Sequence, residues 1–479
     1  MPRLPDARSG ASDRRVLLLV AVVALLVKLP TVGTAAFWDE MAWLGQAGWL
    51  ADNGLIRAVP GLRPDAQFFG HPPGLHFVAA VLFKVFGRSI ELAHVLIACL
   101  SAAGVCATYM LVRAAHDTRT AVLAALLLLF SPAWFSSAGV FLADLPVAAL
   151  GVLCALFVMR GRVLAFFVTA SCMVLIEETA VALVVALIAF RVLTRRPLTR
   201  ATLKDALPYA APLLVFAAFI SVQKVASGRF FYIYDFETDA LFDVGIRSSL
   251  QQAAKISHWM LVAQFRWVLT GAIVLDLLIN PGARRRRELL LFAVVAVASG
   301  YAFAVIFYVP RYVLPVLPFF YALGAVSLMA LSRTPVRQLA TGATAMAVTL
   351  WSLARDPYRG HGEDNMQYLG IVRMHQANAL EVATRYAEAR IVSAWPMAPQ
   401  LSDPLLGYVS VPLLVKWFAG EGDLAEADIA VIARPANDVS DRLEALVRAS
   451  GWRASSTRQH GLNVITIYER PGSRNEGSS

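Results

Sequence analysis

Charged residues are scarce in this sequence. Only 16% of its 479 residues are charged, whereas 58% are hydrophobic. A single soluble core cannot bury so much apolar surface, and the apolar residues occur in long blocks separated by short polar segments. Crossing the roughly 30 Å hydrocarbon layer of a bilayer takes about 20 mostly apolar residues. The blocks between residues 16 and 354 therefore predict a polytopic membrane protein.

Cysteine is also scarce. Cys99, Cys106, Cys154 and Cys172 all fall within apolar blocks and show no metal-ligand spacing, which favours buried free thiols over disulfides or metal ligands. The C-terminal part has no phosphate-cradling glycine loop, because residues 420–422 lack the strand and helix context of a dinucleotide site. We find no clear internal repeat. These absences leave no signal for a thiolate metal site or a nucleotide-binding fingerprint.

The net charge of +10 does not require a polyanionic partner. Arginines cluster beside the apolar blocks, as at residues 14–15, 195–196 and 284–287, and the positive-inside bias of membrane proteins explains this pattern. Residues 1–15 are basic, and the apolar run after them has no clear small-residue cleavage site. We therefore predict an uncleaved first helix with a cytoplasmic N-terminus and no nucleic-acid partner.

The apolar blocks predict about eleven transmembrane helices, the first over residues 16–36. The block at residues 74–87 is too short to cross and predicts an interfacial or re-entrant helix. After residue 354, short β-like runs alternate with helical stretches. The predicted fold class is an all-α polytopic membrane bundle with a small C-terminal α/β soluble domain. Its regions are a cytoplasmic segment 1–15, a bundle 16–354 with outer loops 37–89 and 223–262, and an extracytoplasmic domain 355–479.

Acidic residues gather at the predicted outer ends of the helices. Asp39 and Glu40 follow the first span, Asp144 follows the third, and Glu177-Glu178 follow the fifth. A carboxylate at bilayer-centre depth costs roughly 2.5 to 3.5 kcal/mol, and even an interfacial one usually needs a reason. Ionised at neutral pH, it can take a proton from an attacking hydroxyl or coordinate a cation. We predict that Asp39 is the catalytic carboxylate. Its position alone also allows a simpler role, in which it caps the helix end in water.

The order of these features resembles a known superfamily. Asp39-Glu40, His71-Pro72-Pro73, Asp144 and the segment 311–315 are similar to the GT-C membrane glycosyltransferases. The resemblance is closest to the bacterial dolichyl-phosphate-mannose protein mannosyltransferase-like group that includes the aminoarabinose transferase, and it covers residues 16 to about 330. It implies transfer of a sugar from a polyprenyl-phosphate donor to a lipid, glycan or protein acceptor on the outer face of the bacterial cytoplasmic membrane.

The same resemblance implies roles for individual residues. Asp39 would be the general base of an inverting displacement in which a lipid phosphate leaves. Arg311 would bind that phosphate through its bidentate fork, although a snorkelling interfacial anchor is the alternative interpretation. His71 and Asp144 could instead cap helices. The substrate-binding candidates are Glu40, Arg57, His71, Lys84, Asp144, Glu178, Arg311 and Tyr312.

Glu177 departs from the superfamily pattern, because many members carry a lysine at that place. A positive charge that would meet the donor phosphate is thereby lost, and Lys84, Arg57 or Arg63 could compensate. Adjacent glutamates on a helix project about 100° apart. We therefore predict that one of the pair, Glu178, faces the site.

Cofactors and function class stay open at this point. The candidates for a divalent metal are Asp39, Asp144 and His258, whose spacing is not a ligand motif. A secondary transporter or lipid flippase of the same membrane is the alternative function, but the sequence shows neither paired broken helices nor inverted repeats. A non-catalytic scaffold that presents the C-terminal domain would leave Asp39 dispensable.

Overall fold

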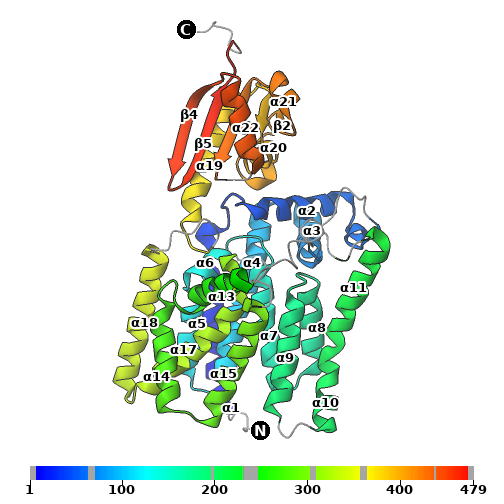
Figure 1. The fold of residues 1–479 in the computed structure, drawn as a ribbon. Helices are drawn as coiled ribbons and strands as arrows, with labels where there is room; N and C mark the ends of the chain where they lie inside the picture. Colours follow the sequence, from blue (N-terminus) through cyan, green and yellow to red (C-terminus); the bar gives the residue numbers. More distant parts are fainter. Residues whose placement is uncertain are drawn as a thin grey trace. The chain divides into compact units, whose positions relative to one another are not determined.

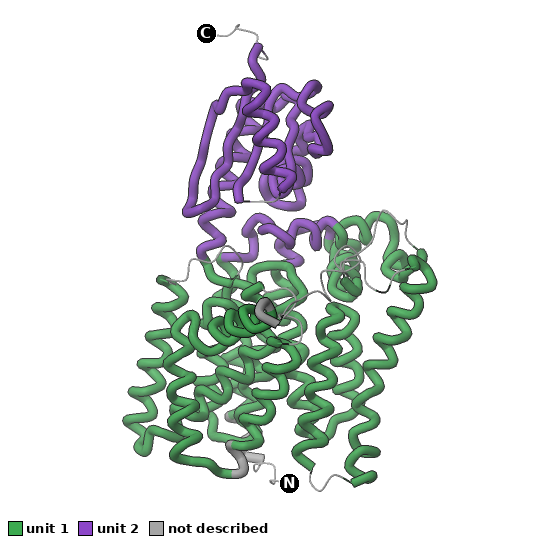
Figure 2. Tube along the Cα trace, viewed as in Figure 1, with its two compact units in different colours: residues 1–30, 46–86, 94–366 green, residues 31–45, 87–93, 367–479 purple. Residues whose placement is uncertain are grey.

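The computed structural model describes residues 7–62, 71–195, 199–228, 230, 246–301, 309–355, 364–435 and 438–472, with backbone alone at residues 7–12, 246–248 and 283–285. The chain divides into two compact units, coloured separately in Figure 2. Unit 1 comprises residues 1–30, 46–86 and 94–366, and unit 2 comprises residues 31–45, 87–93 and 367–479. The predicted C-terminal domain thus shares a compact unit with two short segments from the first hundred residues.

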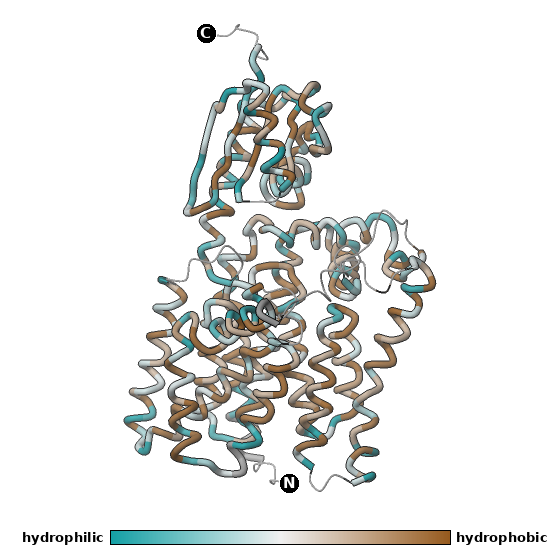
Figure 3. Tube along the Cα trace, viewed as in Figure 1, coloured by the Kyte–Doolittle hydropathy of each residue, from teal (hydrophilic) through white to brown (hydrophobic). Residues whose placement is uncertain are grey.

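Unit 1 is built from helices, most of which are rich in hydrophobic side chains (Figures 1 and 3). Within it, α17 packs against α5 and α14, and α7 packs against α8 and α9. Its main elements are α1 (Ala7–Leu26), η2 (Leu55–Ala58), α3 (Gly74–Phe86), α5 (Thr118–Leu129), α6 (Pro132–Ser137), α7 (Asp144–Arg160), α8 (Val163–Val174), α9 (Ala180–Thr194), α10 (Arg200–Ala206), α11 (Ala211–Ser227), α13 (Ile246–Leu261), α14 (Arg266–Ile279), α15 (Ala283–Val295), the π-helix η5 (Ala296–Tyr301), η6 (Pro310–Val316), α17 (Leu317–Leu331) and α18 (Pro335–Arg355). Helices α2 (Asp39–Asn53) and α4 (Ile90–Arg113) begin in unit 2 and continue into unit 1.

Local chemistry explains where several helices start and stop. Asp117 caps α5 by accepting a hydrogen bond from the Thr120 backbone N–H at 3.1 Å. Pro132 begins a new short helix, α6, which divides the predicted third span. Gly161 ends α7 in the left-handed conformation, with φ 68°. Gln264 and Phe265 have positive φ and separate α13 from α14, which are bent by 87° relative to each other.

The count of membrane spans differs from the prediction of about eleven. Among the described residues, three helices are long and apolar enough to cross a bilayer, and the bent pair of α13 and α14 would make a fourth. Those three are Ile90–Arg113, Arg200–Ser227 and Pro310–Leu331. Other predicted spans coincide with shorter apolar helices, including α5, α8 and α9, because turns and prolines interrupt the apolar blocks. The helical, membrane-type bundle is confirmed, and the number of clear spans is lower.

The predicted outer loops contain helices. Helix α1 ends at Leu26, earlier than the predicted end at residue 36, and α2 starts at Asp39. The acids of its first turn favour a helix there, because they oppose the positive end of the helix dipole. Helix α3 matches the short helix predicted at 74–87. In the second loop, 223–262, α13 is helical, while residues 229 and 231–245 lie outside the described residues.

Unit 2 contains a five-stranded mixed sheet with the order β2-β1-β3-β5-β4. Strands β2, β1 and β3 run parallel, whereas β5 pairs antiparallel with both β3 and β4. The predicted α/β class of this domain is therefore confirmed. Its elements are α19 (Tyr368–Arg385), β1 (Ile391–Ser393), α20 (Met397–Ser402), η7 (Pro404–Leu406), β2 (Val415–Trp417), α21 (Glu421–Glu426), β3 (Ile429–Arg434), α22 (Asp438–Ala449), β4 (Arg453–His460) and β5 (Asn463–Glu469).

The core of this domain explains which strands could be predicted. Val392, Ala430 and Tyr468 from the central strands pack with Leu443 and Val447, one helical turn apart on α22. These strands are apolar, and they coincide with the β-like runs that the sequence predicts at residues 391–394, 429–433 and 464–468. It missed β2, which has three residues, and β4, which is largely exposed and polar, because neither edge strand carries a hydrophobic signal.

Candidate active site

In unit 1, His71 lies against two adjacent glutamates. Its Nδ1 is 3.1 Å from Oε1 of Glu178 and 3.2 Å from Oε1 of Glu177. The three side chains are 21%, 5% and 13% exposed for His71, Glu178 and Glu177, so the group is mostly shielded from water. We call these three residues the histidine–glutamate cluster. Both glutamates approach His71, because the chain turns between α8 and α9 and is not helical there. That Glu178 alone of the pair faces a substrate stays a prediction.

A close backbone contact holds the cluster together. The Gly74 N–H, at the start of α3, donates a 2.7 Å hydrogen bond to the Leu175 carbonyl, at the end of α8. A Cβ at position 74 would lie 2.5 Å from that oxygen, so only glycine fits. Pro72 and Pro73 restrict the backbone just before this contact. The turn carrying the glutamates and the turn carrying His71 are therefore joined by main chain, independently of the side-chain charges.

The pKa values of this cluster reflect burial and charge. Burial raises the pKa of Glu177 to about 7, against the opposing effect of His71. Burial also disfavours the imidazolium form of His71, but Glu177 and Glu178 outweigh it and raise the pKa of His71 well above its usual range. At neutral pH the cluster consequently holds a positive imidazolium, and the Glu177 carboxyl is partly protonated.

The cluster can also accommodate a divalent metal ion. In the described part of the chain, His71, Glu177 and Glu178 each offer one ligand atom, and these atoms lie within 4.8 Å of one another. Imidazole nitrogen and carboxylate oxygen are common ligands of divalent ions. Asp144 and His258, which were predicted as metal candidates, are not members of this group, and Asp39 belongs to unit 2.

Asp144 and Arg311 form an ion pair near the cluster. Arg311 Nε lies 3.1 Å from Asp144 Oδ2, which joins the start of α7 to η6. Asp144 contributes to the raised pKa of Glu177, so it lies within electrostatic reach of the cluster. Unit 1 thus brings together four predicted site residues, His71, Asp144, Glu178 and Arg311, and adds Glu177, which the prediction treated only as a departure.

The acidic pair of the first loop lies in unit 2. Glu40 is 1% exposed, and its Oε2 accepts a 2.9 Å hydrogen bond from the Phe37 N–H. Asp39 is half-buried at the first position of α2. Trp38, the residue directly before Asp39, has φ 48°, a conformation that costs energy for a bulky residue. The two neighbouring acids are therefore in different environments, with Asp39 the more accessible.

The other predicted site residues that the structure describes lie in η6, α3, η2 and α13. Tyr312 follows Arg311 in η6 and is half-buried. Lys84 is exposed on α3, and the Arg57 guanidinium lies 6.0 Å from the centre of the Trp49 ring. His258 is exposed on α13. Arg63 lies outside the described residues.

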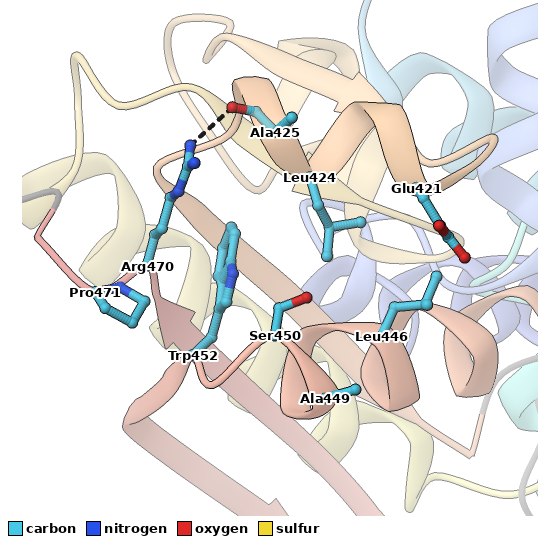
Figure 4. A pocket seen from close by; sticks show the side chains of 9 residues that line it. All are labelled: Glu421, Leu424, Ala425, Leu446, Ala449, Ser450, Trp452, Arg470 and Pro471. Carbon is cyan, nitrogen blue, oxygen red and sulfur yellow. Dashed lines mark hydrogen bonds between the residues drawn. The ribbon is translucent and has the colours of Figure 1, made fainter.

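A separate cavity of about 580 Å³ lies in unit 2 between α21 and α22 (Figure 4). Leu424, Leu446 and Trp452 line it, and Arg470 reaches across to donate a 2.7 Å hydrogen bond to the Ala425 carbonyl. Most of its lining is aliphatic or aromatic, and none of the predicted site residues belongs to it. The reactive groups described above belong to other parts of the chain.

Comparison with known proteins shows a partial match to one family. Residues 70–223, which include the histidine–glutamate cluster and Asp144, match the profile of the dolichyl-phosphate-mannose-protein mannosyltransferases. The match spans less than half of the chain, and this part of the chain is similar to that family of membrane glycosyltransferases. No curated protein matches it by sequence.

Solved structures of glycosyltransferases share the fold. ArnT from Cupriavidus metallidurans bound to undecaprenyl phosphate matches with a TM-score of 0.57 and 15% identity over 96% of this chain and 98% of its own. Its apo state matches with a TM-score of 0.60, 16% identity and the same coverage of 96% and 98%. The archaeal oligosaccharyltransferase AglB from Archaeoglobus fulgidus, in complex with an inhibitory peptide and a dolichol-phosphate, matches with a TM-score of 0.53 and 12% identity over 89% of this chain and 70% of its own. The chain therefore shares the fold of these GT-C glycosyltransferase structures, which its sequence resembles.

Proposed function

We propose that this glycosyltransferase moves a sugar from a polyprenyl-phosphate donor to an acceptor on the outer face of the cytoplasmic membrane, with inversion at the sugar carbon. In this arrangement the N-terminus is cytoplasmic and the C-terminal domain extracytoplasmic. One observation carries the proposal: His71, Asp144, Glu177 and Glu178 converge within the residues that match the mannosyltransferase family. The undecaprenyl and dolichol phosphates held by structural relatives support a lipid phosphate as the leaving group.

Asp39 is the proposed general base. Its carboxylate takes the proton of an acceptor hydroxyl while the hydroxyl oxygen forms a bond to the sugar carbon and the bond to the phosphate oxygen breaks. The leaving phosphate is weakly basic and needs electrostatic stabilisation more than a proton. The half-buried position of Asp39, beside buried Glu40, supports this assignment.

Positive charge for the donor phosphate comes from two side chains in this scheme. Arg311 offers the planar fork that suits phosphate oxygens, and Asp144 orients it. His71, whose pKa is raised, supplies an imidazolium close to Glu177, where many superfamily members carry a lysine. Were a divalent ion held by His71, Glu177 and Glu178, His71 would bind it as a neutral imidazole, and the ion would supply the positive charge in place of the imidazolium.

The test is mass spectrometry of the lipids that co-purify with the full-length protein in mild detergent, compared with Asp39→Asn. We expect a polyprenyl-phosphate sugar to be enriched in the variant, because binding persists while transfer stops. Its mass would give the composition of the sugar. Bulk phospholipid alone in both samples, together with no transfer activity in the unchanged protein, would overturn the proposal and favour a transporter, flippase or scaffold. Transfer activity undiminished in Asp39→Asn would remove Asp39 as the general base.

A further inference from the structure

Both backbone polar atoms of Ala36 are bound by the C-terminal part of unit 2. The Ala36 N–H donates to the Leu406 carbonyl at 2.9 Å, and the Tyr408 hydroxyl donates to the Ala36 carbonyl at 2.7 Å. Tyr408 is 7% exposed. A buried hydroxyl that reaches a backbone carbonyl across more than three hundred residues of sequence fixes the path of the chain just before Asp39.

Ring contacts continue this attachment toward Asp39. The Phe37 ring lies 5.4 Å from that of Tyr368 on α19. The Trp38 ring meets Trp395 edge to face, with centroids 6.4 Å apart and an interplanar angle of 82°. Such aromatic pairs stabilise a contact beyond the effect of their buried area. Each of the three residues before Asp39 therefore has a partner in the domain that follows residue 366.

Gly407 provides the closest approach. It has φ 79°, and a Cβ there would lie 3.2 Å from the Cα and the Cβ of Ala35. The left-handed backbone and the absence of a side chain let the turn at residue 407 pack directly on the chain before Asp39. Gly451 has nearly the same backbone, with φ 74°, but nothing lies within 4 Å of its would-be Cβ. The two glycines differ in whether they contact the segment.

The backbone of the segment that Gly407 contacts is strained at Trp38. Trp38 has φ 48°, and such a conformation persists only where its surroundings determine it. Glu40 adds to this constraint, because it is buried and accepts from the Phe37 N–H at 2.9 Å. Burial and the nearby Glu40 charge also raise the pKa of Tyr408 well above its usual range, so its hydroxyl keeps the proton that it donates.

We propose that the C-terminal α/β domain is a positioning element for catalysis: Gly407 and Tyr408 hold residues 35–41 in the conformation that presents Asp39. The proposal rests on the proposed function, because it takes Asp39 as the general base. It assigns a reaction role to a domain in which neither the cavity nor the sheet carries a reactive cluster. A displacement of about 1 Å in a catalytic group can cost about 100-fold in rate, so small losses of contact here have large effects.

The decisive comparison is Gly407→Ala against Gly451→Ala in the full-length protein. Both variants place a side chain on a left-handed backbone, and only the first meets Ala35. The proteins are reconstituted in vesicles of total lipid extract from the native membrane, which supply donor and acceptor, and released polyprenyl phosphate is measured as the donor fraction is varied. We expect Gly407→Ala to lower kcat at least tenfold with little change in apparent KM, and Gly451→Ala to stay within twofold of the unchanged protein.

Hydrogen exchange separates positioning from general destabilisation. We expect faster amide exchange at residues 36–41 in Gly407→Ala, with the strands β1, β3 and β5 protected as in Gly451→Ala. Equal kcat and equal exchange in the two variants would overturn the proposal. Asp39→Asn is measured alongside. If it is as active as the unchanged protein, Asp39 is not the general base on which this proposal rests, whereas an inactive Asp39→Asn with a fully active Gly407→Ala refutes the positioning role alone.

Tyr408→Phe gives a milder version of the same test. It keeps the ring and removes the hydrogen bond to Ala36, so we expect kcat to fall about fivefold, in line with about 1 kcal/mol for one hydrogen bond. Tyr468→Phe is the matched control, because it removes a buried hydrogen bond to Glu444 in the same domain, away from residues 35–41. Equal activity of the two tyrosine variants would contradict a positioning role for Tyr408.

Discussion

The acidic pairs Asp39-Glu40 in unit 2 and Glu177-Glu178 in unit 1 are arranged in opposite ways. In unit 2 the pair diverges, with Glu40 buried on the Phe37 N–H and Asp39 more accessible. In unit 1 the pair converges, because Glu177 and Glu178 both approach the same ring nitrogen of His71. The local backbone makes the difference, since the first pair begins a helix and the second lies in a turn. Because the first pair diverges, Asp39 is left available for chemistry. Because the second pair converges, Glu177 and Glu178 place their charge on one side of the same histidine ring.

The histidines of the two units differ in a related way. His71 faces two carboxylates, which raise its pKa although burial opposes them. His375 is buried beside an amide, with Nδ1 2.9 Å from Gln400 Oε1, and burial lowers its pKa to about 4. One imidazole is therefore positive at neutral pH and suited to binding an anion. The other is neutral and serves the packing of unit 2.

Replacing Asp39 tests the divergent pair most strongly. Asp39→Asn removes the proposed base and should lower kcat about 1,000-fold while donor binding persists, because a general base contributes 10²–10⁴-fold. The measurement is turnover in native-lipid vesicles together with the amount of bound donor. Asp52→Asn, an exposed change on the same helix, is the matched control and should retain turnover. Comparable turnover in the two variants would leave Asp39 without a catalytic role.

Replacing Arg311 tests the charge balance around the convergent pair. Arg311→Ala should raise the apparent KM for the donor about 100-fold with a smaller change in kcat, because a charged hydrogen bond to phosphate is worth about 1.5–3 kcal/mol. Arg311→Lys keeps the charge but loses the fork and should be intermediate. Arg337→Ala, exposed on α18, is the control. An unchanged donor KM in Arg311→Ala would remove the assigned role.

Acid should destabilise unit 2 through His375. The folded-state pKa of about 4 lies below the usual 6.5, so the unfolded state binds a proton first as the pH falls. Between pH 7 and pH 5 this effect should reduce the free energy of unfolding of unit 2 by about 2 kcal/mol, about a 20-fold change in opening. Hydrogen exchange of β1 and β3, corrected for intrinsic rates, measures it. His375→Gln should flatten the dependence, and an unchanged slope in that variant would contradict the assignment.

Alkali should weaken donor binding through Glu177. Its pKa of about 7 means that the carboxyl loses its proton between pH 6 and pH 8, which adds a negative charge near an anionic donor. We expect the apparent KM for the donor to rise about threefold over that interval, the size of a single charge interaction in a hydrated site. Glu177→Gln should abolish the rise. Repeating the series with EDTA shows whether a bound divalent ion contributes, since chelation would then raise KM at every pH.

Much of the architecture could be predicted from local pattern. The long apolar blocks and the arginines beside them identified a membrane bundle, and the alternating runs after residue 354 identified an α/β domain. The cost of placing a carboxylate in hydrocarbon directed attention to Asp39, Asp144 and Glu178 in the connections. Helix ends were less predictable. The predicted first helix extends to residue 36, yet α1 ends at Leu26, because Pro30 and Gly33 disfavour a continuous helix through this stretch.

What the sequence by itself determined is the chemistry available and its approximate place: carboxylates, a histidine and an arginine between apolar segments, in an order typical of GT-C glycosyltransferases. Tertiary structure alone decided which of these groups meet. Gly74 bonds to Leu175 and brings His71 to both glutamates, and Tyr408 bonds to Ala36 and joins the first loop to the last domain. These contacts join residues separated by about a hundred positions or more. Local hydrophobic periodicity carries no information about such pairs, because burial and backbone hydrogen bonding select them only when the whole chain packs.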